Sequence, residues 1–456
     1  MISIVAQPVC IISQRDVTRV CIRWIVTVGL AVLTAWDTSA GSLPIAAPFG
    51  IDVTSSPYSA KGDGVTDDTE ALQRAIDAVS ATGGTVWLPH GVYKTSRTLK
   101  VAASNVSLVG DGAARIRFQP KEPYEVAVND RALILGADAL SERRPLAGGA
   151  VPAGAVTFRA ASAKQTSDLA PGDWLIVQET DPRVDNEIVW IDWVQVGSVD
   201  GPAVRLQSPF RTTFPNNHTP ATLIFQKVLR VVENIAVRDL AIEAPLTRKP
   251  VVGVAVAIVR GVLLERVTSN VANGNAFFSY RSADVSLREC RQLRTATQAT
   301  EFAATMGLRL IGNTFGVVGT SISRAPANTS SLVLDYGTAF FEVVGNEVTT
   351  GGNILMQLTM GVHDGVVANN IFGWSRNSTI GEGQGIVAAG AQNLMVIGNV
   401  LIGGDGPNNT GISFAPSTNL AAQIPSQGNV IGPNIIRNYA HPYGTMLTPD
   451  AYVPVR

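Results

Sequence analysis

The chain has 456 residues, of which 46% are hydrophobic and only 16% are charged, and its formal net charge is −1. Charged residues make up about 25% of an average globular protein, and a chain without a basic excess lacks the electrostatic signature of a nucleic-acid-binding protein. With 43 glycines and 25 prolines, the composition is typical of a large soluble protein built from strands and turns. The sequence therefore indicates no nucleic-acid partner.

Residues 1–40 have the features of a bacterial-type secretory signal peptide. Three arginines precede an apolar run over residues 24–36, and small residues follow at 38–40. The run is shorter than the roughly 20 residues that a spanning helix needs. We expect a secreted or periplasmic protein without a membrane partner after cleavage; an uncleaved anchor is the alternative. Cleavage would leave Cys290 as a single thiol, which allows no internal disulfide.

Residues 61–94 predict one helix followed by strands. Asp67 is expected to cap the helix, and Glu70 to return the capping-box hydrogen bond. The helix then presents one apolar face and stops at Gly83-Gly84. Short strands follow on both sides of the Pro89-His90-Gly91 turn. The acidic residues of this opening, Asp63, Asp67 and Asp68, are expected to serve the turn and the helix start.

This opening resembles that of the pectate lyase superfamily, also called rhamnogalacturonase/epimerase-like. The resemblance is carried by Gly62-Asp63-Gly64, Thr66-Asp67-Asp68-Thr69, the helix, Gly83-Gly84-Thr85-Val86 and Leu88-Pro89-x-Gly91-x-Tyr93. It is dense over about residues 49–118 and thin afterwards. In that family such an opening caps a right-handed parallel β-helix, so the resemblance implies an all-β solenoid with an N-terminal capping α-helix. The superfamily contains lyases, hydrolases, epimerases and phage tailspikes, so fold alone does not select the chemistry.

Residues 120–232 predict a β-rich excursion from the solenoid. It is preceded by the N-terminal cap and the first turns of the helix (41–119) and followed by the regular coils and a C-terminal cap (233–456). Its strands include residues 187–194 and 203–206, which are joined through the hairpin signal Asp200-Gly201. Its tryptophans, Trp174, Trp190 and Trp193, are expected to pack in the core or the hairpin rather than to stack on sugar rings.

After residue 233 a short motif repeats: hydrophobic, any, small, Asn, any, hydrophobic. Its anchors are expected at Glu289, which replaces Asn, and at five asparagines, namely Asn313, Asn346, Asn370, Asn399 and Asn434. The intervals of about 24 to 35 residues are in the range of solenoid coils. Stacked asparagines are expected to form a ladder of side-chain amides.

A second strand in each coil suggests a candidate active site. If these strands pair in parallel, Arg281, Glu301, Asp335 and Gln357 are expected to form an outward column with about 5 Å between rungs. Two carboxylates on adjacent coils would raise the pKa of one, as a general acid requires, and glycoside hydrolysis uses such a pair. Alternatively, Arg281 would neutralise a uronate carboxylate while Tyr280 removes the proton beside it, which is β-elimination. Solvated charges on a solenoid face remain the ordinary alternative.

Other residues are candidates for contacting the substrate. Besides Gln357 these are Tyr336 and the pair His363-Asp364, which is expected to lie in a turn and suits acid–base work. The sequence has none of the Asn-Thr-Asp, Gly-His-Gly or Arg-Ile-Lys motifs of polygalacturonases, nor the Asp-Pro-His of alginate epimerases. Trp190-Ile191-Asp192-Trp193 resembles the Trp-x-Asp-His of calcium-dependent pectate lyases, but Trp193 stands in place of the histidine. No catalytic residue is therefore carried over from these families, and no cofactor or metal is expected.

We expect an exported enzyme that cleaves the glycosidic bonds of a polysaccharide substrate in a groove along the β-helix, as a lyase or a glycoside hydrolase. The alternatives are a sugar epimerase, a non-catalytic carbohydrate-binding or surface-attachment protein, or a tailspike-like module. The expected signal peptide argues against the tailspike, because phage particles assemble in the cytoplasm. The oligomeric state is left open.

Overall fold

The computed structural model describes residues 50–120, 130–137, 139–181, 187–215, 222–244, 250–272, 274–294, 300–316, 330–349, 354–373, 383–403, 409–416 and 424–444. The expected signal peptide lies outside the described residues, so the structure does not test it. Among the helices of the described residues, none combines the length and apolarity that crossing a membrane requires.

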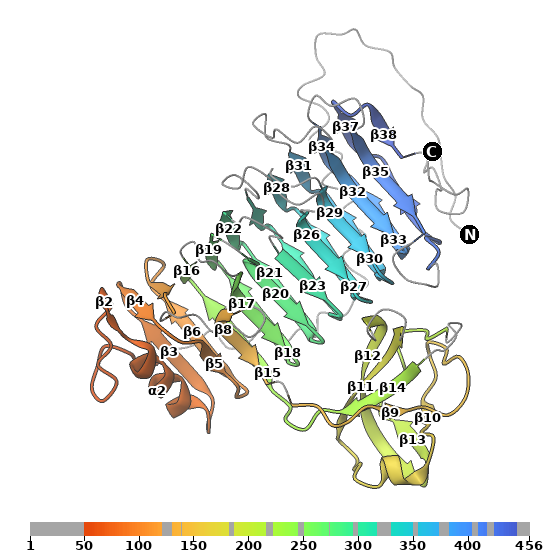
Figure 1. The fold of residues 1–456 in the computed structure, drawn as a ribbon, viewed down its shortest axis with the longest axis horizontal. Helices are drawn as coiled ribbons and strands as arrows, with labels where there is room; N and C mark the ends of the chain where they lie inside the picture. The colour runs from red at the N-terminus through yellow and green to blue at the C-terminus, as the bar shows by residue number, and fades with distance from the viewer. Residues whose placement is uncertain are drawn as a thin grey trace, which may run out of the picture. The chain divides into compact units, whose positions relative to one another are not determined.

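Three long parallel sheets run along the molecule (Figure 1). The first sheet consists of β1 (Ile51–Asp52), β3 (Gly84–Leu88), β6 (Val106–Gly110), β15 (Glu233–Arg238), β18 (Arg260–Glu265), β21 (Ala283–Arg288), β24 (Arg309–Ile311), β27 (Ala339–Val344), β30 (His363–Ala368), β33 (Gln392–Ile397) and β36 (Val430–Ile431). The second consists of β2 (Asp63–Asp67), β4 (Val92–Thr95), β7 (Arg115–Phe118), β16 (Ala241–Ala244), β19 (Thr268–Val271), β22 (Arg291–Arg294), β25 (Thr314–Phe315), β28 (Glu347–Thr349), β31 (Ile371–Gly373), β34 (Val400–Ile402) and β37 (Ile435–Arg437). The third consists of β5 (Leu99–Val101), β8 (Asp130–Gly136), β17 (Val251–Ala257), β20 (Phe277–Tyr280), β23 (Thr300–Ala303), β26 (Ser330–Asp335), β29 (Ile354–Thr359), β32 (Gln384–Ala389), β35 (Thr410–Ala415) and β38 (His441–Tyr443).

Each coil contributes one strand to each sheet, and successive coils pair in parallel, so the predicted fold class, an all-β parallel β-helix, is confirmed. The inward side chains of the three sheets meet in one continuous apolar core. Because side chains alternate across a strand, every second residue joins this core and its neighbours face outward. The core is rich in fully buried phenylalanines, among them Phe277, Phe302, Phe341, Phe372 and Phe414.

The turn from the third sheet to the first repeats from coil to coil. Its first residue has a left-handed backbone in five successive coils, at Ile258, Arg281, Ala304, Tyr336 and Met360, with φ between +49° and +57°. This conformation is uncommon for residues other than glycine. The neighbouring coils hold it in place, because main-chain hydrogen bonds join these turns, for example from the Ala304 amide to the Asp335 carbonyl at 3.1 Å.

The asparagine ladder is confirmed. The Nδ2 atoms of Asn313, Asn346 and Asn370 each donate to the Oδ1 of the next asparagine at 2.9 Å, and Asn399 donates to Asn434 at 3.0 Å. The expected anchor at Glu289 is wrong by one residue. The main-chain amide of Cys290 donates to the Asn313 Oδ1 at 2.8 Å, so Cys290 occupies the ladder position, and Glu289 takes the left-handed turn before it.

The N-terminal cap contains the predicted helix, α2 (Thr69–Val79), but not the predicted capping box. The helix begins after Asp68, whose carboxylate instead accepts hydrogen bonds from the main chain of Lys61 and Gly62 at 2.7 and 3.0 Å. Glu70 forms an ion pair with Arg97 rather than returning to the main chain. The acidic opening thus fixes the loop before the helix, which agrees with its expected structural role.

The segment predicted as a β-rich excursion divides between the helix and a subdomain. Strand β8 pairs with β5 and β17 in the third sheet. The chain then builds a six-stranded antiparallel sheet in the order β10-β13-β12-β11-β14-β9 before it returns at β15. We call this sheet and its loops the antiparallel subdomain. Its strands are β9 (Arg144–Pro145), β10 (Thr157–Arg159), β11 (Trp174–Asp181), β12 (Glu187–Asp200), β13 (Ala203–Leu206) and β14 (Thr222–Lys227), and it has one 3-10 turn, η1 (Ala163–Thr166).

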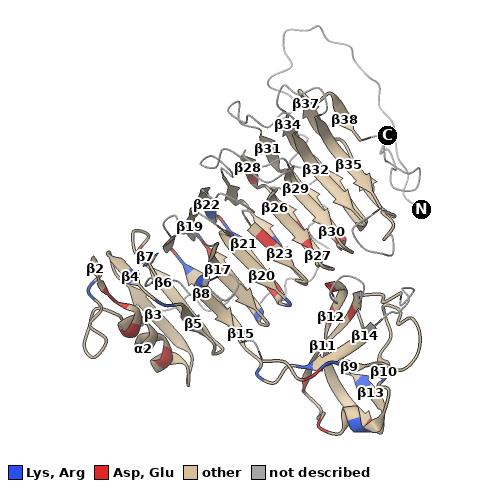
Figure 2. Cartoon of the chain, in the orientation of Figure 1, with Lys and Arg blue, Asp and Glu red and all other residues tan. Residues whose placement is uncertain are grey.

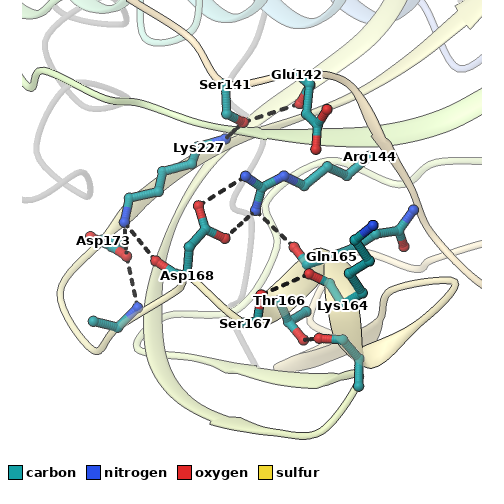
Figure 3. A network of polar contacts seen from close by, with 12 residues as sticks. Ser141, Glu142, Arg144, Lys164, Gln165, Thr166, Ser167, Asp168, Asp173 and Lys227 are labelled. Carbon is teal, nitrogen blue, oxygen red and sulfur yellow. Dashed lines mark hydrogen bonds and ion pairs between the residues drawn. The ribbon is translucent and has the colours of Figure 1, made fainter.

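A polar network holds the loops of the antiparallel subdomain together (Figure 3). The guanidinium of the buried Arg144 forms two hydrogen bonds with the Asp168 carboxylate, at 2.6 and 2.9 Å, and a third with the carbonyl of Gln165. The hydrogen bond between them lowers the pKa of Asp168. Lys227 joins the same network through Asp173, with 2.7 Å between Nζ and Oδ2. This network ties the η1 loop to strand β9 and to β14.

Asp192 on β12 is a buried acid whose titration is expected to affect stability. Its side chain is 1% exposed, and this burial raises its pKa to about 6. The hydrogen bonds that its Oδ2 accepts from the main chain of Thr212 and Arg211 oppose the rise. In the unfolded chain an aspartate titrates near pH 3.9. The folded state therefore holds the proton more tightly, and the stability from this group is present below pH ~4 and is lost as pH rises through about 6.

We expect Asp192→Asn, which mimics the protonated acid, to gain stability over the wild type as pH rises from 4 to 7, by on the order of 2 kcal/mol. Urea unfolding at each pH measures the difference in the free energy of unfolding. Asp200→Asn, at the exposed end of the same strand, is the control and should show no such trend. A difference between Asp192→Asn and wild type that stays constant across this range would contradict the assignment.

Candidate active site on the third sheet

Between β17 and β35, the strands of the third sheet carry charged side chains at only one place. From β17 to β35 its strands contain two ionisable acids and no lysine or arginine, and the acids are Glu301 on β23 and Asp335 on β26. Strands β32 to β35 of the later coils have no charged residue (Figure 2). The two acids therefore lie on adjacent coils of an otherwise uncharged face.

The strand register corrects the predicted column. Glu301 pairs with Phe278 on one side and with Val333 on the other, and Val333 pairs with Gln357. Asp335 pairs with Ala303, two residues further along the strand. Glu301 and Gln357 thus share one outward column with a valine between them, and Asp335 belongs to the neighbouring column. From the spacing of about 4.8 Å between strands and about 3.3 Å per residue, the Cα atoms of the two acids are roughly 8 Å apart.

Asp335 is the more buried of the two acids. Its side chain is 7% exposed, and no described residue donates a hydrogen bond to its Oδ1. Burial is the largest cause that raises the pKa of Asp335 well above its usual value, and the negative charges of Glu301 and Glu187 raise it further. A buried carboxyl without donors is best accommodated as the neutral acid.

Glu301 is partly exposed and has one hydrogen-bond donor. Asn275 Nδ2 donates to its Oε2 at 2.9 Å. Burial raises the pKa of Glu301, and the bond from Asn275 opposes this rise. The two acids therefore differ in surroundings, since Glu301 has a donor that stabilises its anion, whereas no described residue donates to the Oδ1 of Asp335. Pairs of this kind separate the acid and base roles in a site.

Arg281 and Tyr280 do not join the acids as predicted. Arg281 follows β20 in the left-handed turn, and its guanidinium lies over the Tyr280 ring at 4.9 Å and contacts Gln226 of the antiparallel subdomain at 3.5 Å. Tyr280 shares the column of Asp335, two coils away, and its ring stacks on Phe278 with centroids 6.4 Å apart. The expected outward position of Arg281 in the column is wrong, because the strand ends one residue before it.

The remaining candidates lie at different distances from the acids. Gln357 is in the column of Glu301, and its Oε1 accepts a hydrogen bond from Ser330 at 2.8 Å. Tyr336 directly follows Asp335, and its hydroxyl donates to the Glu187 Oε1 at 3.1 Å. Burial and the neighbouring acids raise the pKa of Tyr336. These two residues therefore border the pair of acids.

His363 and Asp364 lie apart from the third sheet. They begin strand β30 of the first sheet rather than a turn, and only Asp364 has a left-handed backbone. The His363 ring is 3% exposed, between Trp190 at 5.0 Å and Phe340 at 5.5 Å. Its Nδ1 lies 2.8 Å from the Asp364 Oδ2. Burial tends to raise the pKa of Asp364, but the hydrogen bonds and charges of its neighbours, His363 first and then Asn393 and Arg211, together lower it. The structure buries His363 against Trp190 of the subdomain, whereas the Asp364 side chain is 38% exposed, and both residues lie on the first sheet rather than on the sheet of the two acids.

The structure also brings residues to the site that the sequence did not single out. Phe278 pairs with Glu301 and adds an aromatic ring beside it. Asn275 binds Glu301, and Glu187 approaches from the subdomain. The tryptophans of the subdomain pack as predicted: Trp190 and Trp193 are at most 9% exposed, and Trp174 lies against the Arg260 guanidinium at 3.7 Å. Among the described residues, no three His, Cys, Asp or Glu side chains come together as a metal site.

Comparison with known proteins supports the family resemblance. Residues 52–137 match the model of the family described as Rhamnogalacturonase A/epimerase, pectate lyase-like. The matched residues are the N-terminal cap and the first coils of the β-helix. The chain is 50% identical to Alginate lyase 7 of Azotobacter vinelandii over 62 residues, which are 12% of this chain and 7% of that protein. The chain thus spans less than a tenth of the length of this curated relative.

Solved structures share this fold over most of the chain. The surface adhesin PfbA of Streptococcus pneumoniae has a TM-score of 0.53 at 12% identity, and the match covers 86% of this chain and 79% of that one. The tailspike protein gp49 of Pseudomonas phage LKA1 has a TM-score of 0.50 at 15% identity, covering 84% and 70%. At these identities the likeness shows the fold alone.

Proposed function

We propose that this chain is a glycoside hydrolase that cleaves a polysaccharide on the outward face of its third sheet. The observation that carries the proposal is the pair Glu301 and Asp335, two acids on adjacent coils of a face that has no other charge from β17 to β35. The names of the relatives agree with a polysaccharide substrate, since one is an alginate lyase. The apolar run over residues 24–36 supports export to where such polymers occur.

The two acids fit the two roles of hydrolysis. Asp335 keeps its proton because it is buried beside other negative charges, so it is the general acid that protonates the leaving glycosidic oxygen. Glu301, which has a donor for its anion, is the carboxylate that either activates water or attacks the sugar directly. Phe278 beside Glu301 offers a ring on which a sugar can stack.

A lyase is the second candidate, favoured by the similarity of residues near the N-terminus to an alginate lyase. Elimination requires a cation at the uronate carboxylate and a base at the neighbouring carbon. The strands that carry the two acids contain no lysine or arginine, and Arg281 contacts Gln226 of the subdomain. The geometry therefore favours hydrolysis.

Incubation of the purified protein with a panel of acidic and neutral polysaccharides tests the proposal. We expect new reducing ends without the ultraviolet absorbance of unsaturated uronates, because hydrolysis adds water and elimination creates a double bond. New absorbance would replace the hydrolase with the lyase. Binding without either product would leave a carbohydrate-binding or surface-attachment protein.

A further inference from the structure

The antiparallel subdomain reaches the pair of acids through one side chain. Glu187, the first residue of β12, accepts a hydrogen bond at 3.1 Å from the hydroxyl of Tyr336, which directly follows Asp335. The two partners are 149 residues apart in the chain. This contact places a third carboxylate at the edge of the site.

Strand β12 is held against the β-helix at backbone distance. A Cβ atom added to Gly337 would lie 2.5 Å from the carbonyl oxygen of Val189, and one added to Gly361 would lie 2.2 Å from the same oxygen. Neighbouring residues of β12, Ile188 and Ile191, join an apolar cluster with residues of the β-helix that include Ala304 and Met306. Two glycines in successive turns thus allow the strand to approach closely, and apolar contacts hold it there.

We propose that the antiparallel subdomain completes the site by placing the Glu187 carboxylate beside Asp335. The Tyr336 hydroxyl holds this carboxylate, and Glu187 acts as a positioning residue for the general acid. The inference rests on the proposed function and extends it to the subdomain. Glu187 does not touch the reacting atoms in this scheme. Its negative charge favours the protonated form of Asp335, as the direction of the Asp335 pKa shift supports, and Tyr336 fixes its distance.

The pH dependence of turnover tests this role. A general acid must be protonated, so activity falls as pH rises through its pKa. Glu187→Gln removes a charge that raises the pKa of Asp335, so we expect the alkaline limb of kcat/KM to move to lower pH by about 0.5 to 1 unit. Tyr336→Phe should move it in the same direction by less, because the carboxylate remains but is no longer held. Asp200→Asn, which removes a charge from the exposed end of the same strand, should leave the limb in place.

A second measurement does not depend on a substrate. The infrared band of the Asp335 carboxyl, taken as the difference between 13C-aspartate-labelled protein and its Asp335→Asn variant, reports the protonation of Asp335 directly. We expect its midpoint to move to lower pH in Glu187→Gln. An unchanged midpoint would overturn the inference. A shifted midpoint in a protein that hydrolyses none of the polysaccharides would instead support the coupling and count against the proposed function.

The close approach of β12 gives an independent test. Gly337→Ala should displace the strand and lower kcat by about tenfold or more, because a side chain at this position meets the Val189 carbonyl. Gly345→Ala is the matched control: its φ of +66° resembles the +74° of Gly337, but nothing lies within 4 Å of its added Cβ. Equal activity in the two alanine variants, at equal stability, would show that the position of the subdomain does not matter to the site.

Discussion

Replacing Asp335 with asparagine is expected to lower kcat by about 10³-fold, within the range that general acid–base catalysis supplies. The amide has the shape of the acid but no proton to give to the leaving oxygen. Burial raises the pKa of Asp335 and so favours its neutral form, and we therefore expect the neutral amide not to weaken the fold. Glu301→Gln should lower kcat by a similar factor through the loss of the base or nucleophile.

Reducing-end release and thermal unfolding, measured on the same samples, separate catalysis from folding. Glu342→Gln, on the first sheet and in a half-exposed ion pair with Arg309, is the control for the loss of a carboxylate elsewhere on the helix. Its activity should equal that of the wild type. Full activity in both Asp335→Asn and Glu301→Gln would remove the third sheet as the site.

Replacing Asn370 with alanine is expected to lower the free energy of unfolding by about 3–5 kcal/mol. Asn370 lies inside the ladder and is fully buried. Its Oδ1 accepts from both the amide and the side chain of Asn346 at 2.9 Å, and its Nδ2 donates to the Val343 carbonyl at 2.8 Å. The variant leaves these buried groups without partners, and each one costs about 1–3 kcal/mol.

Urea unfolding gives the loss, and Asn434→Ala at the end of the ladder is the comparison. Asn434 is partly exposed, so water can replace its hydrogen bonds to Asn399, and we expect a smaller loss than in Asn370→Ala. If both variants lost the same small amount, the ladder would not be a source of stability inside the helix. The activity of Asn370→Ala well below its unfolding temperature should be retained, since the ladder lies away from the two acids.

The fold could be predicted because its signals are local. The cap residues and the helical face before Gly83 are patterns within a few residues, and they carry the family resemblance that implied the parallel β-helix. The repeated asparagines added intervals in the range of solenoid coils. The ladder failed only where Cys290 replaces asparagine. In that coil the ladder position holds the apolar Cys290, and the polar residue is Glu289, one position earlier. The motif was aligned on a polar residue, so the prediction placed the anchor at Glu289.

The site could be predicted only in part, because strand register depends on the lengths of turns. Residues 304–308 separate β23 from β24, whereas residues 336–338 separate β26 from β27. Met306 already pairs with Ala339, so residues 304–305 precede this bridge in one coil and residues 336–338 precede it in the next. Counting back from Asn313 and Asn346 would place Asp335 level with Phe302, whereas it pairs with Ala303, two residues along the strand from Glu301. A two-residue shift keeps a side chain on the same face, which is why both acids still point outward. Arg281 differs because its strand ends at Tyr280.

Glu187 could not be predicted, because its contact with Tyr336 joins residues 149 positions apart. Nothing in the sequence near Glu187 indicates which turn of the solenoid it meets. The burial of His363 has the same origin, since Trp190 of the subdomain covers it. Packing between the two parts thus decides which polar residues remain available for chemistry.

The antiparallel subdomain interrupts the winding at one corner. In the coil that follows the subdomain, the third sheet is connected to the first by residues 258–259, between β17 and β18. In the coil that contains the subdomain, the same connection, between β8 and β15, consists of residues 137–232. Strand β15 pairs in parallel with β6 before the insertion and with β18 after it, so the insertion does not interrupt the first sheet. Such a scaffold permits evolution or protein engineering to replace the antiparallel subdomain with another module. The replacement would change the substrate selectivity of the site without altering the coils that carry Glu301 and Asp335.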